Sequence, residues 1–260
     1  MGAEDAANAN EPDVRRFRPL ERFSSAVENY RRFRPSYPDG LRAALVELLP
    51  DAPNANVLDL GAGTGISTRW LRELPKSRVF GLEPNASMLA AAAEEGGAFL
   101  RARSEQLPFV DRSVDLFVGA QCWHWFELDR VLPELRRVGR AGSWSVAFWN
   151  VRRVDGCAAG YEALLLEHSA GYQGVTQGRT PLERIARRLG RSLDLERVLS
   201  WEDPLDWETL LGRTRSASYV IHEVADRPAY EAALRDWFEA EQRDGRVRMP
   251  YECVLGGWRL

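Results

Sequence analysis

Three closely spaced glycines between an apolar run and a helical pattern constrain the fold of this chain more than any other feature. The run VLDL, residues 57–60, leads into Gly61, and Gly63 and Gly65 follow before the pattern ISTRWLREL. Glycine accepts left-handed backbone angles and lets a ligand approach the main chain, because it has no Cβ. The N-terminus of the following helix offers N–H groups without partners. We therefore predict a buried strand, a tight turn and a helix, with a ligand held at the turn.

The same alternation of apolar runs and helical patterns continues on both sides of this turn. Apolar runs bounded by turn residues predict strands at residues 57–63, 78–83, 98–103, 113–121 and 143–150. Apolar residues at helical spacing predict helices at residues 41–49, 66–74, 86–95 and 127–138. Asn85 should cap the third of these helices, and Pro133 should bend or divide the fourth. Strands that alternate with helices form a mostly parallel sheet covered on both faces, so the predicted fold class is α/β, doubly wound.

After Asn150 the alternation becomes less regular. Two helical patterns, at residues 158–170 and 181–190, lead us to interpret residues 151–200 as a lid or a small helical insertion over the sheet edge. Two more strands, at residues 196–202 and 251–260, bring the predicted sheet to seven strands, and helical patterns cover residues 206–213 and 227–243. We predict a disordered tail over residues 1–13 and a single domain over residues 14–260.

Composition argues against several classes of protein. The formal net charge is −3, which is unlike the basic excess of a nucleic-acid-binding protein. No apolar run approaches the roughly 18 residues of a membrane span, and the first residues are polar and acidic, unlike a secretory signal peptide. The three cysteines and three histidines lack the spacing of a disulfide framework or a metal site. We expect a cytoplasmic protein with no metal, no nucleic-acid partner and no membrane partner.

The glycine spacing and one carboxylate select the class of ligand. A dinucleotide site has the spacing G-x-G-x-x-G, and a phosphate-binding loop ends in Gly-Lys-Ser/Thr. Here the third glycine comes one residue early and is followed by Ile66. Glu83 ends the next strand, 24 residues after Asp59, where a carboxylate can accept hydrogen bonds from both hydroxyls of a ribose. The pattern predicts a nucleoside site that does not bind a phosphate.

These motifs resemble those of a known family. The segments VLDLGAGTG, VFGLEPNASML, SEQLPFVDRSVDLFVGAQCWHWF and FWN resemble class I S-adenosylmethionine-dependent methyltransferases, in the small-molecule branch of the trans-aconitate and ubiquinone/menaquinone enzymes. The resemblance implies a Rossmann-like seven-stranded fold, an N-terminal helical lid within residues 14–50 and the cofactor S-adenosyl-L-methionine. It also implies methyl transfer to a small organic acceptor through a hydroxyl, carboxylate, amine or carbon nucleophile. The family's Pro-Gly-Gly turn before the fifth strand is replaced here by the segment GRAG, residues 139–142.

The resemblance further implies roles for individual residues. The turn Gly61–Gly65 would hold the methionine part of the cofactor, and Glu83 would hold its ribose. The Ser104-Glu105 pair matches the segment that meets adenine, and Gln121 matches a position that lines the methionine. The motif Y-x-x-x-R-P, which begins at Tyr30, matches a lid over the amino-acid end. The implied cofactor-binding residues are Tyr30, Arg34, Asp59, Gly61, Ala62, Gly63, Gly65, Glu83, Pro84, Met88, Ser104, Glu105 and Gln121.

The segment WHWF after the fourth strand is the candidate for the acceptor side, because open α/β sheets bind ligands at the carboxyl ends of their strands. His124 is a candidate general base, and a structural or pocket-lining role is the alternative. The two tryptophans either shape the acceptor pocket and face the sulfonium or belong to the core. Asn150 either donates to a ligand or is a turn residue. The candidate acceptor-binding residues are Trp123, Trp125, Asn150, Ser218 and Tyr219.

The sulfonium makes the cofactor's methyl group electrophilic, so catalysis would consist chiefly of aligning the acceptor for in-line attack. Two alternatives remain open at this point. One is attack on the aminobutyryl chain of the same cofactor, which releases 5′-methylthioadenosine. The other is a non-catalytic module that binds the cofactor and regulates a partner. An aromatic pocket under a lid suits natural-product and central-metabolite chemistry equally.

Overall fold

The structure, a computed structural model, describes residues 32–169, 172, 180–217, 220–221 and 224–260. The predicted disordered tail lies outside this part, as do three candidate site residues, Tyr30, Ser218 and Tyr219. Among the described residues, no helix has both the length and the apolar character needed to cross a membrane.

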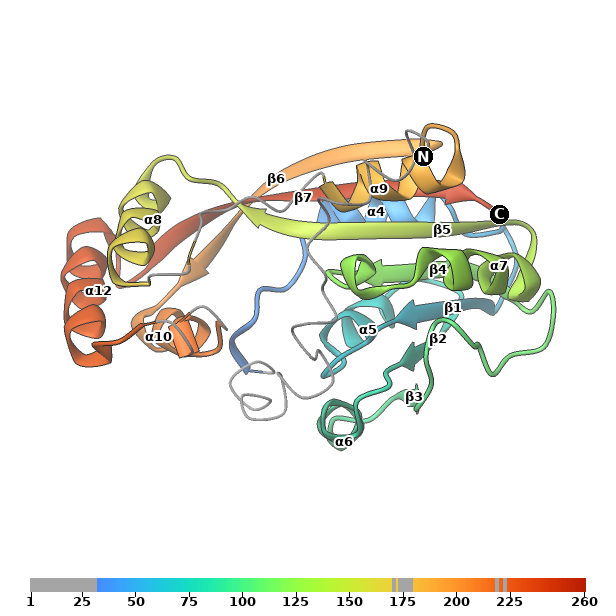
Figure 1. Cartoon of the computed structure of the whole chain (residues 1–260), viewed down its shortest axis with the longest axis horizontal. Helices are drawn as coiled ribbons and strands as arrows, with labels where there is room; N and C mark the ends of the chain where they lie inside the picture. The colour runs from blue at the N-terminus through green and yellow to red at the C-terminus, as the bar shows by residue number, and fades with distance from the viewer. Residues whose placement is uncertain (1–31, 170–171, 173–179, 218–219, 222–223) are drawn as a thin grey trace, which may run out of the picture.

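A mixed sheet runs through the whole molecule (Figure 1). Its strands are β1 (Ala55–Leu60), β2 (Ser77–Leu82), β3 (Ala98–Leu100), β4 (Val114–Ala120), β5 (Gly139–Arg152), β6 (Leu195–Leu205) and β7 (Val247–Arg259). Their order is β3-β2-β1-β4-β5-β7-β6. Strand β7 is antiparallel to its neighbours β5 and β6, and the other pairs are parallel. The predicted seven-stranded, mostly parallel α/β sheet is therefore confirmed.

Helices cover both faces of this sheet and also gather beyond one end of it. They are α4 (Asp39–Val46), α5 (Ile66–Leu71), α6 (Ala86–Glu94), α7 (Leu128–Val138), α8 (Cys157–His168), α9 (Thr180–Leu189), α10 (Trp207–Arg215) and α12 (Arg227–Glu241), with the 3₁₀ turn η3 (Trp123–Trp125). One apolar core lies between the sheet and α7 and α9, and a second lies between the sheet and α4 and α5. Successive side chains of a strand point to opposite faces. Accordingly, Phe117 of β4 belongs to the first core, and Leu116 and Val118 belong to the second.

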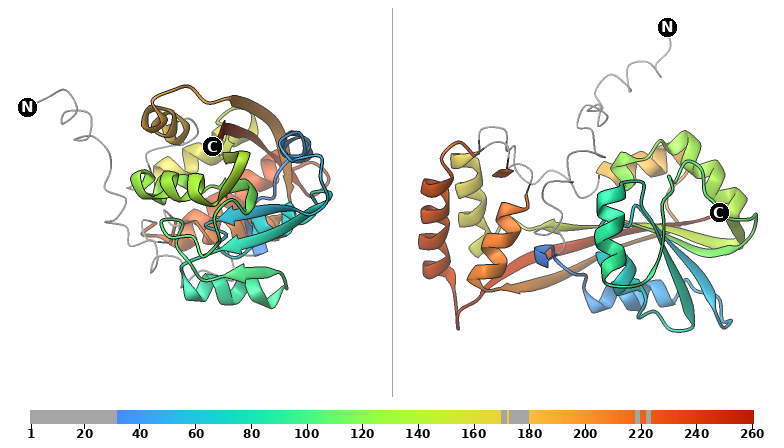
Figure 2. Two further views of the ribbon diagram at one scale, coloured as in Figure 1. Left: turned by 90° about the vertical axis from the view of Figure 1, so that its right-hand side faces the viewer. Right: turned by 90° about the horizontal axis from the view of Figure 1, so that it is seen from below.

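Helices α8, α10 and α12 form a separate cluster, which we call the helical unit. It has its own apolar core, built around Tyr161, Leu210 and Leu234 and closed by the near ends of β6 and β7. Figures 1 and 2 show the unit beyond the carboxyl ends of β5 and β6, connected to the rest of the molecule by the long strands β5, β6 and β7. The carboxyl ends of β1 and β4 point toward it.

Buried charges join the helical unit to the end of β5. Arg152 forms an ion pair with Glu162 of α8, and its guanidinium also donates to the hydroxyl of Tyr172 at 2.8 Å. The same guanidinium lies over the ring of Tyr161, 4.5 Å from its centroid. Because both members of the ion pair are largely buried, removal of either would leave an uncompensated charge in the protein interior.

The segment 32–38, which we call the strap, contacts both the helical unit and the sheet. At the helical unit, the Arg213 Nε donates to the carbonyl of Phe33 at 2.8 Å. At the sheet, the Asn150 side chain donates to the carbonyl of Ser36 at 2.8 Å. The ring of Tyr37 packs edge-on against Phe148, with centroids 4.9 Å apart. The strap therefore links the helical unit to the centre of the sheet.

The structure confirms most of the predicted elements and changes three expectations. Helix α7 is continuous through Pro133. Proline has no N–H to donate to the carbonyl four residues earlier, but Pro133 lies on the exposed face of the helix, where that carbonyl can bond to water. Residues 139–142 are the first residues of β5 and not a separate turn. Helix α8 follows β5 as an insertion, but α9 packs on the sheet, while α10 and α12 join α8 instead.

Candidate active site

The loop after β1 is shaped by a buried carboxylate. Asp59 is fully buried, and its Oδ2 accepts hydrogen bonds from the hydroxyls of Ser67 at 2.7 Å and Thr68 at 2.6 Å. Both hydroxyls lie in the first turn of α5, so Asp59 fixes the start of this helix against the strand. The other oxygen, Oδ1, is buried and has no hydrogen-bond partner among the described residues.

Glu83 connects the glycine turn to the end of β2. Its Oε2 accepts from the Gly63 N–H at 2.9 Å, and its Oε1 accepts from the Asn85 N–H at 2.7 Å. A carboxylate has about four acceptor positions, so each oxygen keeps capacity for another donor. Asn85 caps α6 with its side chain, which accepts from the N–H groups of Ser87 and Met88, as predicted.

Burial raises the pKa of both acids. The pKa of Asp59 rises to about 7, chiefly because of desolvation, and the nearby Glu83 raises it further. The pKa of Glu83 also rises through burial, against the lowering effect of its two backbone hydrogen bonds. Two carboxylates in one buried region repel each other when both are ionised. A positively charged ligand at the turn would relieve this repulsion.

The three glycines serve different purposes. A Cβ on Gly63 would have only the Met88 sulfur near it, at 4.0 Å, so the space above this residue is open to a ligand. A Cβ on Gly65 would lie 2.8 Å from the ring of Phe99, so this position needs glycine for packing. All three glycines have a left-handed φ, at +64° for Gly61, +59° for Gly63 and +82° for Gly65, in the region that favours glycine. The prediction of close ligand approach therefore applies best to Gly63.

The segment after β3 lies at the same sheet edge as Glu83. The Glu83 N–H donates to the carbonyl of Leu100 at 3.1 Å. Ser104 is buried, and Glu105 is half-buried with its Oε1 accepting from the Glu127 N–H at 3.3 Å. The other candidates at this edge are the half-buried Pro84 and the buried Ala62 and Met88.

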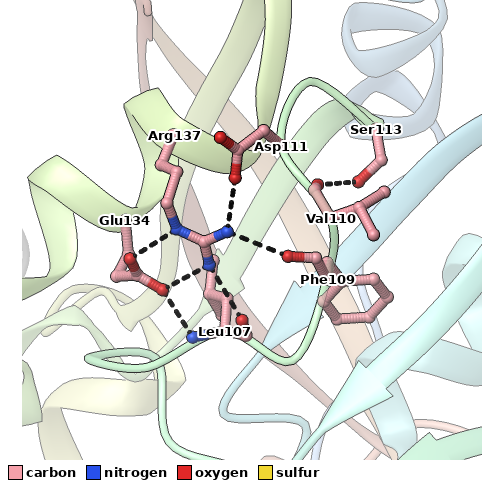
Figure 3. A network of polar contacts seen from close by, with 7 residues as sticks. All are labelled: Leu107, Phe109, Val110, Asp111, Ser113, Glu134 and Arg137. Carbon is pink, nitrogen blue, oxygen red and sulfur yellow. Dashed lines mark hydrogen bonds and ion pairs between the residues drawn. The ribbon is translucent and has the colours of Figure 1, made fainter.

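Sequence reasoning missed Arg137, which organises the loop that follows this segment (Figure 3). It donates to both carboxylate oxygens of Glu134, to the carbonyls of Leu107 and Phe109, and to Asp111. The spacing of Glu134 and Arg137, three residues apart on one helix, was the available signal, because such residues are neighbours on a helix surface.

The end of β4 positions the WHWF segment. Gln121 is half-buried with a φ of +60°, a left-handed conformation that is uncommon for a residue other than glycine. Trp123 is only 1% exposed, and its ring packs edge-on against Trp258 with centroids 4.9 Å apart. The structure therefore places Trp123 in the core and corrects its assignment to the acceptor pocket. The core alternative holds for this residue.

His124 and Trp125 are half-buried and lie against each other, with ring centroids 4.5 Å apart. Burial lowers the pKa of His124 to about 4, and the charge of Arg184 on α9 lowers it further. Arg184 also donates to the carbonyl of Phe126 at 2.9 Å, so α9 covers this segment. His124 is neutral at pH 7, and its conjugate acid is too strong for an efficient general base at that pH.

Asn150 and Arg34 occupy the region of the strap. The Asn150 amide group holds the carbonyl of Ser36, and its oxygen, Oδ1, is buried without a partner among the described residues. Arg34 is half-buried within the strap. The structure thus brings Asp59, the glycine turn and Glu83 together, and places Asn150 where β5 meets the strap.

These residues fit S-adenosylmethionine. The ligand combines a cationic methionine end with a ribose, and the turn offers a buried unpartnered acceptor on Asp59, a second on Thr64 Oγ1 and open space at Gly63. Glu83 retains acceptor capacity for hydroxyl groups. Two buried carboxylates, Asp59 and Glu83, lie behind the turn, and the Arg69 guanidinium beside it donates to the Thr64 carbonyl at 3.0 Å.

Comparison with known proteins shows what this part of the chain is similar to. Residues 58–147 match the family model described as a methyltransferase domain. An uncharacterized methyltransferase of Mycobacterium tuberculosis is 42% identical over 132 residues, which are 50% of this chain and 52% of the relative. A malonyl-[acyl-carrier protein] O-methyltransferase of Pectobacterium atrosepticum is 37% identical over 101 residues, 38% of this chain and 40% of that protein. The chain thus spans about half the length of the first curated relatives it matches.

A solved structure from Anaeromyxobacter dehalogenans, provisionally described as a type II methyltransferase, covers more of the chain. Its TM-score is 0.67 and its sequence identity is 27%, over 87% of this chain and 98% of that one. The fold, the glycine turn and the family match agree with one another. Residues 58–147 are thus similar to a methyltransferase domain, and the site fits the cofactor S-adenosylmethionine.

Proposed function

We propose that this protein transfers the methyl group of S-adenosylmethionine to a small organic acceptor. The observation that carries the proposal is the glycine turn with two buried carboxylates behind it, one of which keeps an unpartnered oxygen. The position of the helical unit supports a small acceptor, because this unit faces the carboxyl ends of β1 and β4.

The chain's own residues would bind and orient the cofactor. When bound, S-adenosylmethionine supplies a methyl group made electrophilic by its sulfonium. Glu83 would accept hydrogen bonds from the ribose hydroxyls while its Oε2 keeps the Gly63 N–H in place. Asp59 Oδ1 would face the positive charge of the methionine end through the glycine turn. Orientation of this kind supplies most of the rate of a displacement reaction between bound partners.

The low pKa of His124 favours an acceptor that reacts without losing a proton to a base. With its pKa lowered to about 4, His124 is neutral at pH 7 and a weak proton acceptor. An acceptor that is already nucleophilic at neutral pH, above all a carboxylate, reacts without losing a proton. We therefore place the acceptor among small organic acids, which agrees with the resemblance to the trans-aconitate branch. His124, Trp125 and Asn150 then line the acceptor pocket, and Ser218 and Tyr219, outside the described residues, stay candidates for the same pocket.

A product assay tests the proposal. The purified full chain is incubated with S-adenosylmethionine and a panel of small carboxylic acids, phenols and amines, and adenosyl products are identified by mass spectrometry. We expect S-adenosylhomocysteine in stoichiometric amounts with a methyl ester of one acid, and less product with Glu83→Ala at subsaturating cofactor. Formation of 5′-methylthioadenosine in place of S-adenosylhomocysteine would show transfer of the aminobutyryl chain instead. Tight cofactor binding without turnover of any acceptor in the panel would favour the non-catalytic module.

A further inference from the structure

The loop after β3 is held by a network that uses every N–H of one arginine (Figure 3). Arg137 donates its Nε to Glu134 Oε1 and one Nη2 proton to Glu134 Oε2, both at 2.8 Å. Its remaining protons go to the carbonyls of Leu107 and Phe109, each at 3.0 Å, and to Asp111 at 2.8 Å. Such a set requires the planar fork of a guanidinium, which a lysine cannot reproduce.

The network fixes the main chain of Leu107 on both sides. Glu134 Oε2 accepts from the Leu107 N–H at 2.8 Å, and Arg137 donates to the Leu107 carbonyl. The side chain of Leu107 is buried in the core, and Phe109 packs edge-on against Phe80 of β2 with centroids 6.2 Å apart. Leu107 therefore has a single well-defined position relative to α7.

Helix α7 holds the segment 103–107 at two separate points. Near the start of the helix, the Glu127 N–H donates to the side chain of Glu105 at 3.3 Å. Near its end, Glu134 and Arg137 hold Leu107. Between them the chain makes a tight turn, in which the Gln106 N–H donates to the Arg103 carbonyl at 3.1 Å. The rigid helix thus sets the position of Ser104 and Glu105.

The order of the strands places the base of the cofactor at this segment. Glu83 directly follows β2. In the order of the strands, β1 and β4, which carry the glycine turn and Gln121, lie on one side of β2, and β3 lies on the other side. If the ribose binds Glu83 and the methionine lies at the glycine turn, the base must extend toward β3 on the other side. The residues that follow β3 are those of the segment 103–107.

We propose that Arg137 is a positioning residue for adenine recognition, which it achieves without contact with the cofactor by fixing Leu107 and thereby Ser104 and Glu105. This inference rests on the proposed function, because it takes S-adenosylmethionine to bind at Glu83 and the glycine turn. The inference gives the loop 107–113 a role in selecting the base of the cofactor, in addition to its role in stabilising the fold.

The test compares two ligands in three variants. S-Adenosylhomocysteine and S-inosylhomocysteine differ only at the C6–N1 edge of the purine, where an amino donor and a ring acceptor are replaced by a carbonyl acceptor and an N–H donor. The ratio of their Kd values therefore measures recognition of adenine. Both Kd values are determined by titration calorimetry for Arg137→Lys, for Glu134→Gln and for the control Arg136→Lys, whose side chain is exposed on the same turn of α7. Arg137→Lys keeps the charge and removes the fork, so it is the variant expected to fold.

For the wild type we expect a preference for the adenine ligand of about tenfold or more, in the range that a buried polar contact supplies. Arg137→Lys and Glu134→Gln should reduce this preference to about threefold or less. In both variants kcat at saturating cofactor should stay near the wild-type value while the KM for the cofactor rises. The control should match the wild type in all respects.

Two results would overturn the inference, and they differ from failure of the proposed function. An unchanged preference for adenine in Arg137→Lys and Glu134→Gln would show that the network only stabilises the fold, whatever happens to the melting temperature. Equal binding of both ligands by the wild type would show that the segment does not read the base. Absence of S-adenosylhomocysteine binding in the wild type would instead contradict the cofactor site itself.

Discussion

The Gly63 N–H donates to the Oε2 of Glu83 at 2.9 Å, so the turn after β1 and the carboxylate after β2 are directly bonded. These two residues come from different strand–helix units, and their contact aligns the two halves of a nucleoside site before any ligand arrives. Glu83 therefore contributes both acceptor capacity and the shape of the turn.

Replacement of Glu83 by alanine should weaken cofactor binding by at least tenfold, which corresponds to about 1.4 kcal/mol. The reason is the loss of the acceptor for the ribose together with the bond to Gly63. Titration calorimetry with S-adenosylhomocysteine measures the effect, and circular dichroism shows whether the variant is folded. An unchanged Kd in a folded variant would refute the ribose assignment.

Stability in the absence of ligand should fall as pH rises from about 5 to 7. Asp59 keeps its proton in the folded state up to about pH 7, whereas the ordinary pKa of an aspartate in an unfolded chain is 3.8. The folded state therefore binds more protons in this window, and stability decreases with pH by at most about 1.4 kcal/mol per unit. The acids whose pKa is lowered, such as Glu134 and Glu231, act below this window.

Urea denaturation at pH 5, 6 and 7 measures this dependence, and Asp59→Asn provides the comparison. The amide cannot ionise, so the free energy of unfolding of the variant should depend less on pH between these values. The slope that remains is due to Glu83, whose pKa is also raised. A wild-type profile that rises toward pH 7 would contradict the assignment of a proton to buried Asp59.

The pH dependence of turnover should lack an ionisation of His124 near 6.5, the ordinary pKa of histidine. Burial and Arg184 lower the pKa of His124 to about 4, so its protonation state does not change between pH 5.5 and 8. His124→Gln should reduce kcat by less than about tenfold with a carboxylate acceptor, below the usual contribution of a general base. A larger loss, with an ionisation near 6.5 that disappears in the variant, would restore His124 as the base.

Two glycine-to-alanine substitutions test whether the strap packs firmly against α10. A Cβ on Gly212 would lie 2.3 Å from the ring of Phe33, whereas one on Gly40 would lie 3.6 Å from Leu199, an ordinary contact. Both residues are in helices, so alanine gains about 1 kcal/mol of helix propensity at either site. Gly40→Ala should therefore be neutral or stabilising, and Gly212→Ala should be destabilised by about 1–3 kcal/mol through overpacking. Equal melting temperatures for the two variants would show that the strap is not firmly held on α10.

The alternation of strands and helices was predictable because each element carries its own periodicity and its own end signals. The glycine turn before α5 and the Asn85 cap of α6 are local signals, and both are confirmed. The helical unit was not predictable in this way, since an amphipathic helix does not specify the partner against which it packs. The sequence predicts both α8 and α9 as helices after β5, yet α9 covers the sheet and α8 does not.

The two tryptophans of the WHWF segment show the same limit at the site. Their positions in the sequence differ by two residues, and only the three-dimensional structure separates them. Gly119 on β4 leaves room for the ring of Trp123, because a Cβ there would lie 2.1 Å from its indole nitrogen. Trp125 has no such recess and stays half-buried beside His124. Likewise, the role of Arg137 depends on a loop that lies about 30 residues away in the sequence.

The helical unit is encoded almost entirely after residue 156, and the glycine turn, Glu83 and the WHWF segment are encoded before residue 127. Strands β5, β6 and β7 connect the unit to the sheet. Substitutions, insertions or exchange of α8, α10 and α12 can therefore accumulate without altering any residue that we assign to the cofactor. In evolutionary terms, the residues assigned to the cofactor and the helical unit lie in different stretches of the chain, so the unit can change without a new donor site.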